Sequence, residues 1–116
     1  MTLKTDYTTN LTDPVTGALP KAFNEGSAFV TTNLALLSSS LTTAAAAGQT
    51  TFTVFITTSY LPEALKLNGN LLKSYLDGIY AGLTAQGIYR TYEVTLSLDT
   101  STVGTNKIKF NFTFTL

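Results

Sequence analysis

The sequence predicts an α+β fold, and three observations support that prediction. Apolar residues recur at helical spacing in two stretches, alternate with polar residues in three others, and show neither pattern in residues 1–23. We therefore expect a three-stranded, largely antiparallel sheet with two helices packed on one face, preceded by an extended N-terminal arm. The expected order is arm, helix, strand, helix, strand, strand. A length of 116 residues, with 44% hydrophobic and 12% charged residues, suits a single α+β domain over residues 24–116.

Residues 1–23 contain turn-forming residues in place of a hydrophobic period. These residues are Asn10, Asp13, Pro14, Gly17 and Pro20. They predict an extended arm. Two interpretations of the arm stay open: a poorly ordered chain end, or a segment that becomes ordered on a neighbouring subunit.

The arm also carries apolar residues that can contact a partner. Tyr7, Leu11, Val15 and Leu19 recur at every fourth position. The proline and glycine residues between them argue against a helix, because both disfavour a helix interior. We nevertheless take these four as candidate partner-interface residues.

A first helix is expected over residues 24–47. Its apolar stripe consists of Val30, Leu34, Leu37 and Leu41, widened by Phe29 and Leu36. Asn24 can cap its start and Gly48 can end it. Serine and threonine residues lower its helix propensity, so packing against the rest of the domain must hold it.

In residues 50–58, successive side chains divide between an apolar side and a threonine-rich side, as expected for a strand. Phe52, Val54 and Ile56 share one side, whereas Phe55 lies among threonines on the other. Threonine makes up roughly a fifth of the chain, and its branched Cβ favours strands while its hydroxyl tolerates solvent. A threonine-rich face turned to solvent is therefore expected, with Phe55 exposed on it.

A second helix is expected over residues 70–86. Its stripe consists of Leu72, Leu76, Ile79 and Leu83. Gly78 and Gly82 lie four residues apart and thus on one face, where another element can approach closely. Gly87 is a suitable terminator.

The last two strands show the clearest alternation. On the first, over residues 88–98, the core side carries Ile88, Tyr92, Val94, Leu96 and Leu98, and Tyr89 lies on the opposite side with the threonines. On the second, the core side carries Ile108, Phe110, Phe112, Phe114 and Leu116. Each large apolar side chain buried here contributes roughly 1.5–3 kcal/mol, so this hairpin supplies much of the core.

Composition argues against most catalytic chemistry. The chain has no histidine and no cysteine, which removes the preferred ligands of zinc, iron and copper and the common nucleophile arrangements. The seven acidic residues form no recognisable pair. We expect no enzymatic activity, no cofactor and no metal site.

Net charge and hydropathy limit the classes of partner that we expect the chain to bind. Seven basic and seven acidic residues give a net charge of zero, which disfavours nucleic-acid binding and leaves self-association unopposed by charge. No apolar run reaches the length of a membrane span. We expect protein partners, including further copies of the chain, and no nucleic acid or membrane.

The second half of the chain resembles small virion structural proteins of tailed bacteriophages, including phages of cyanobacteria. The resemblance covers roughly residues 50–116 and lies in TFTVFITTSY at 51–60, LNGNLLKSY at 67–75, GIY at 87–89, VTLSLDT at 94–100 and FNFTF at 110–114. It implies a non-enzymatic particle component, made in the host cytoplasm and located in the virion. A capsid decoration (cement) protein that oligomerises and docks on other virion proteins is the first expectation.

Two alternatives remain from the sequence. One is a head–tail connector or tail component. The other is a small host- or ligand-binding module that uses the exposed threonine and tyrosine face of the sheet, with Phe55 and Tyr89 as its aromatic contacts.

Overall fold

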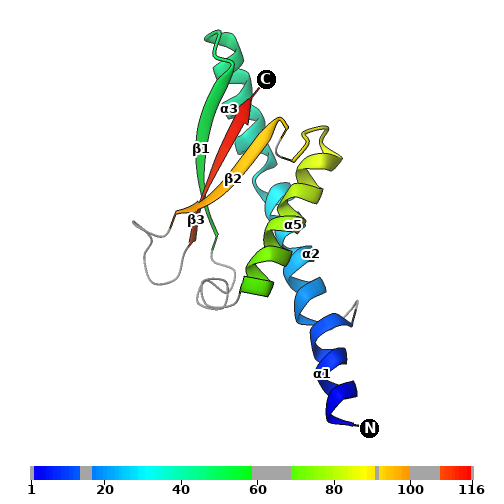
Figure 1. Cartoon of the computed structure of the whole chain (residues 1–116). Helices are drawn as coiled ribbons and strands as arrows, with labels where there is room; N and C mark the ends of the chain where they lie inside the picture. Colours follow the sequence, from blue (N-terminus) through cyan, green and yellow to red (C-terminus); the bar gives the residue numbers. More distant parts are fainter. Residues whose placement is uncertain (1, 14–16, 59–68, 91, 100–107, 116) are drawn as a thin grey trace.

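The computed structural model describes residues 2–13, 17–58, 69–90, 92–99 and 108–115 (Figure 1). Its elements are α1 (Leu3–Thr12), α2 (Ala18–Thr32), α3 (Leu34–Ala46), β1 (Thr51–Thr58), α5 (Gly69–Ala85), β2 (Val94–Asp99) and β3 (Ile108–Thr115). The α+β class and the single antiparallel sheet confirm the prediction from the sequence.

The sheet has the order β1-β3-β2, so the last strand lies in the middle. Strand β3 runs antiparallel to both neighbours, and Phe112 lies between Val54 on one side and Leu96 on the other. Strand β3 carries the longest strict alternation, and its central place buries Phe110, Phe112 and Phe114 on one of its faces.

Helices α2 and α5 cover one face of the sheet and form the core with β3 (Figure 1). Phe110, Phe112 and Phe114 are at most 2% exposed, as the alternation predicts. The ring of Phe110 lies 5.6 Å from that of Phe29 in α2 and 5.7 Å from that of Tyr75 in α5, measured between centroids. The aromatic residues of the last strand are therefore largely core residues.

Helices α2 and α5 touch through their backbones, because glycine stands where they cross. A Cβ at Gly78 would collide with the backbone carbonyl of Phe23, and one at Gly26 with that of Tyr75. The close approach expected at Gly78 is thus confirmed. Gly26 supplies the matching surface on α2.

The N-terminal segment is helical, which corrects the expectation of an extended arm. Helix α1 occupies Leu3–Thr12, and α2 begins at Ala18 rather than at residue 24. The Thr2 side chain accepts a hydrogen bond from the Thr5 N–H and caps α1. Pro20 lies in the first turn of α2, where its missing N–H has no intrahelical partner to lose. Of the turn-forming residues, Asp13 and Gly17 separate the two helices, whereas Asn10 lies within α1 and Pro20 within α2. Pro14 lies outside the described residues.

The single helix expected over residues 24–47 is two helices that meet at Asn33. The Asn33 side chain donates to the Phe29 carbonyl at 2.8 Å, and its backbone leaves the helical region. Leu36 is 49% exposed on α3, so it does not widen the buried stripe as expected. Helix α2 also passes through the expected start of the domain, with Ala22 fully buried.

Strand β2 begins at Val94, six residues later than expected. Gly87 adopts a positive φ of 85°, and the Ile88 N–H then bonds the Leu83 carbonyl, which ends α5. A turn follows in which the Glu93 N–H bonds the Tyr89 carbonyl. Tyr92, expected on the core side, is therefore 81% exposed.

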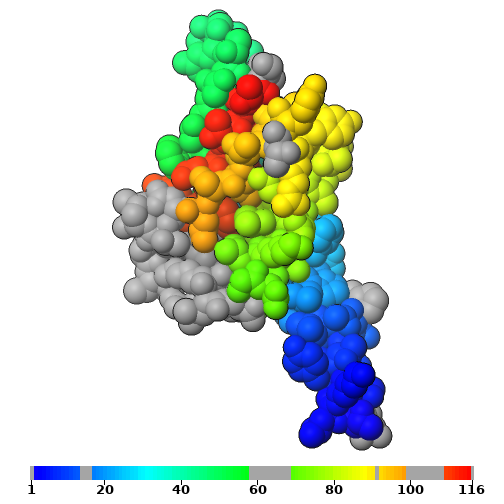
Figure 2. Space-filling view, viewed as in Figure 1, coloured from blue at the N-terminus to red at the C-terminus, as the bar shows by residue number. Residues whose placement is uncertain are grey.

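The molecule is elongated. It measures 60 × 30 × 21 Å, and α1 extends from one end of the body (Figures 1 and 2). The open face of the sheet and the exposed helix α1 are thus separate surfaces.

Candidate interaction surfaces

The sheet face opposite the helices is open and rich in hydroxyl groups. Two of its cross-strand rows are Thr53–Thr113–Thr95 and Phe55–Asn111–Ser97. We call this surface the open sheet face and define it by these residues with Thr57 and Lys109. Phe55 is 56% exposed near its middle, as the sequence predicts.

Side chains on the open sheet face contact one another. The Lys109 ammonium lies 5.0 Å from the centre of the Phe55 ring, a distance at which a cation is attracted to the ring face. The Asn111 amide donates to the Ser97 hydroxyl at 3.4 Å, whereas its buried carbonyl oxygen accepts no hydrogen bond from the residues that the structure describes. The face is polar, but among the residues that define it Lys109 alone is charged.

The outer edge of β2 is covered. The Leu96 N–H donates to the Tyr80 hydroxyl of α5 at 2.9 Å. Arg90 lies 4.4 Å from the centre of the Tyr80 ring and pairs with Asp77 at 2.7 Å. Side chains from α5 and from the turn before β2 therefore cover this edge around Leu96.

Among the described residues, no hydrogen bond reaches the outer edge of β1. Its eight residues include no charged residue, no proline and no glycine. Helix α3 lies beside it (Figure 1), and a groove between the two is lined by Ser39, Thr43, Ala44, Phe52 and Val54, among others. The two edges of one sheet thus differ sharply.

Helix α1 forms a third surface. It buries no residue, with Leu3 90% and Tyr7 68% exposed and Leu11 half-buried. These three residues are four positions apart and share one helix face; we call them the α1 stripe. An exposed apolar stripe on a projecting helix is suited to contact with another protein.

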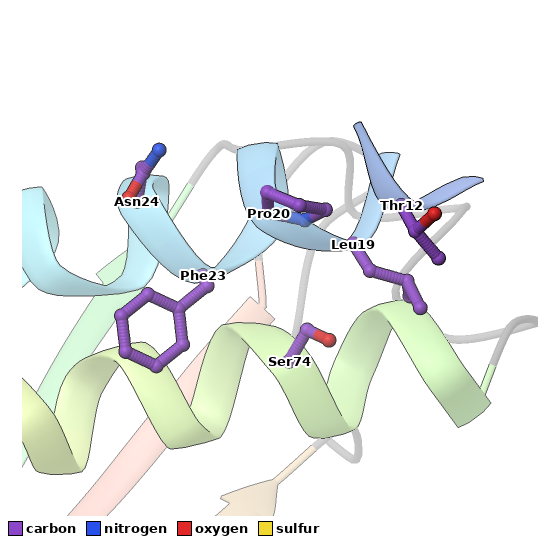
Figure 3. A pocket seen from close by; sticks show the side chains of 6 residues that line it. All are labelled: Thr12, Leu19, Pro20, Phe23, Asn24 and Ser74. Atoms are coloured by element: carbon purple, nitrogen blue, oxygen red, sulfur yellow. The ribbon is translucent and has the colours of Figure 1, made fainter. Parts of the chain in front are cut away.

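A groove runs beside the start of α2 (Figure 3). It encloses about 410 Å³ and is lined by Thr12, Leu19, Pro20, Phe23, Asn24 and Ser74. Leu19 and Phe23 both extend from α2 toward α5. Phe23 remains 38% exposed, so apolar surface is accessible here too.

The candidate residues from the sequence do not form one patch. Tyr7 and Leu11 share the α1 stripe, Leu19 lines the groove of α2, and Phe55 lies on the open sheet face. Tyr89 is 54% exposed in the turn before β2, so it does not lie on the sheet face beside Phe55 as expected. Val15 lies outside the described residues.

Sequence reasoning did not single out several exposed apolar side chains as contact residues. These are Leu3, Phe23, Leu36 and Tyr92. Leu3 had a usable signal, because it lies four residues before Tyr7 and extends the same repeat. Phe23 had none, because its exposure follows from how α2 crosses α5.

No arrangement of metal-binding side chains occurs among the described residues, where no three Asp or Glu side chains come together. Asp77 forms ion pairs with Arg90 at 2.7 Å and with Lys73 at 3.7 Å.

No helix among the described residues is long and apolar enough to cross a membrane.

Comparison of the chain with protein-family models, with curated proteins and with solved structures found no match.

Proposed function

We propose that this chain is a non-enzymatic structural protein of a phage particle, which oligomerises and docks on other particle proteins. A capsid decoration (cement) protein is the first choice, and a head–tail connector or tail component uses the same surfaces. The resemblance of residues 50–116 to small phage virion proteins supports the phage assignment. The observation that carries the docking role is the α1 stripe at one end of an elongated molecule.

Helix α1 buries none of its residues within its own chain, so contact with a partner would add stabilising packing that it lacks. It is held by local hydrogen bonds, such as those from the Thr8 and Thr12 hydroxyls to backbone carbonyls one turn earlier. Short helices are marginal in water without tertiary packing. Docking that buries Leu3 and Tyr7 would stabilise the helix and remove apolar surface from water.

The test is co-sedimentation of the purified chain with phage particles that lack it. A double variant, Leu3→Ser with Tyr7→Ser, removes the α1 stripe, and Leu36→Ser removes an exposed leucine from α3 as the matched control. We expect the double variant to lose particle binding and the control to keep it. A chain that neither co-sediments nor occurs in purified particles from infected cells would contradict the proposal.

A second candidate is a module that binds a host surface or a ligand on the open sheet face. It is favoured by Phe55, an aromatic ring exposed among hydroxyl groups beside Lys109. Under this candidate, Phe55→Ser abolishes attachment to host cells while the α1 double variant leaves it intact. The reverse pattern, or no attachment to host cells, rejects it.

A further inference from the structure

The contacts of β2 show which backbone groups of β1 face outward. The Leu96 N–H bonds the Tyr80 hydroxyl and the Val94 N–H bonds the Tyr89 carbonyl, so both point away from β3. In an antiparallel ladder, hydrogen-bonded and non-hydrogen-bonded pairs alternate. Leu96 and Phe112 are therefore a non-hydrogen-bonded pair.

The same alternation continues across β3 to β1. Because the backbone groups of Phe112 do not face β2, they face β1 and bond Val54, the register partner of Phe112. The residues on either side of Val54 then direct their N–H and C=O groups away from the sheet. These outward-facing residues are Thr51, Thr53, Phe55 and Thr57.

This outward row has the features of a strand that accepts another strand. Among the described residues, no backbone or side-chain group bonds it. The register of β1 with β3 is continuous over eight pairs, without a bulge. Bulges, prolines and charged side chains are the usual devices that block pairing at a sheet edge, and β1 has none of them.

We propose that β1 pairs antiparallel with β1 of a second copy of this chain, joining two sheets into one of six strands. This deepens the proposed function by naming the contact through which the chain oligomerises. The two-fold axis stands perpendicular to the sheet, so both open sheet faces lie on one side and both helical layers on the other.

Charge and side-chain pairing favour a second copy as the occupant. Strand β1 is uncharged, so a two-fold copy brings no like charges together, and the net charge of the chain is zero. With the axis at Val54, Thr53 lies opposite the second copy's Phe55, and Phe52 lies opposite its Ile56. Apolar side chains then meet on the core side, where Phe52 is half-buried and the groove beside α3 opens.

The contact should be weak in solution. An edge pairing of one strand covers less than the roughly 1,200 Å² typical of stable interfaces. We expect a dissociation constant of roughly micromolar order. Sites that hold neighbouring copies on a particle would raise the effective concentration and favour pairing.

The first experiment measures mass by sedimentation velocity from about 1 μM to about 1 mM, a range that spans weak association. Phe55→Pro removes an outward-facing N–H, and proline at that position spares the ladder to β3. Phe55→Thr removes the same ring but keeps the N–H, and is the matched control. We expect Phe55→Pro to raise the dissociation constant roughly ten- to hundredfold and Phe55→Thr to raise it by less than about tenfold. Near-UV circular dichroism confirms that both variants are folded.

The second experiment follows amide hydrogen exchange by NMR at low and high concentration. Protection of the Thr53, Phe55 and Thr57 amides should rise with concentration. The Thr95 and Ser97 amides face β3 whether or not copies pair, so their protection should not change.

Three outcomes overturn the inference: a monomer at every concentration, a Phe55→Pro variant that dimerises like the natural chain, or protection of β1 that appears only when a particle protein is added. A monomer that still binds particles through α1 would reject the β1 contact but leave the docking role in the proposed function standing. A dimer that binds no particle would support the β1 contact and contradict the docking role.

Discussion

Helices α1 and α2 follow one another in the chain but are stabilised in different ways. Helix α2 buries Ala22, Gly26, Phe29 and Val30 against α5 and the sheet, whereas α1 buries none of its residues. Helix α1 is defined by its cap at Thr2 and by side chains that bond their own backbone. Tertiary packing holds one helix and local hydrogen bonds hold the other.

This difference separates the residues that maintain the fold from those available for contact. A change at the α2–α5 crossing must disturb the core, because the two backbones touch there. A change on the α1 stripe removes apolar surface that the chain itself does not use. The two regions should therefore respond in opposite ways in tests of stability and of binding.

A large loss of stability is expected from Gly78→Ala. The added methyl group meets the Phe23 carbonyl, so α2 and α5 must separate, and we expect a loss of about 3 kcal/mol or more in the free energy of unfolding. Gly69→Ala on the same helix is the matched control, because a Cβ there meets no atom of the described residues within 4 Å. It should be neutral or stabilising by up to about 1 kcal/mol. Urea denaturation measures the free energy of unfolding of both variants. Equal losses would contradict the claim that the α2–α5 crossing maintains the fold.

A smaller effect is expected from Tyr80→Phe. The change leaves the Leu96 N–H without its acceptor, at a cost of about 1–2 kcal/mol. Exchange of the Leu96 amide should accelerate more than that of the Thr95 amide. Tyr89→Phe serves as the control, since that ring is 54% exposed, and should change stability by less than about 0.5 kcal/mol.

Deleting residues 2–12 should reduce the free energy of unfolding by about 1 kcal/mol or less, because α1 contributes no fully buried side chain. The same deletion should strongly weaken particle association. Differential scanning calorimetry and co-sedimentation measure the two effects. A collapse of thermal stability would mean that α1 belongs to the core.

The smallest effect on stability is expected from Tyr7→Ser, within about 0.5 kcal/mol, because the side chain is 68% exposed. Tyr75→Ser sharpens the contrast. That ring is 1% exposed among Phe29 and Phe110, and its removal should cost about 3–5 kcal/mol. Chemical denaturation of the two variants measures both losses in the free energy of unfolding. Similar losses would contradict the contrast between α1 and the core.

The sheet was predictable because its signal is periodic. Phe110, Phe112 and Phe114 alternate with polar residues, and a buried face requires that pattern in a central strand. The second helix was predictable for the same reason, with Ile79 and Leu83 buried as its stripe indicates. Periodicity does not report where a strand starts, so the turn after Gly87 was missed.

The candidate surfaces were less predictable because they depend on contacts between distant residues. Helix α1 has a weak apolar period, and its defining features are a capping threonine and side chains bonded to the preceding turn. The cover over β2 depends on a tyrosine hydroxyl reaching a strand sixteen positions away. Only the exposed ring of Phe55 followed directly from alternation, since its neighbours Val54 and Ile56 are buried.

Amide hydrogen exchange across α1, measured in the free chain and in the particle-bound chain, tests the central claim most directly. We predict that the α1 amides exchange much faster than those of α5 in the free chain and become protected on the particle. Protection of α1 equal to that of α5 in the free chain, or no change on binding, would contradict the account.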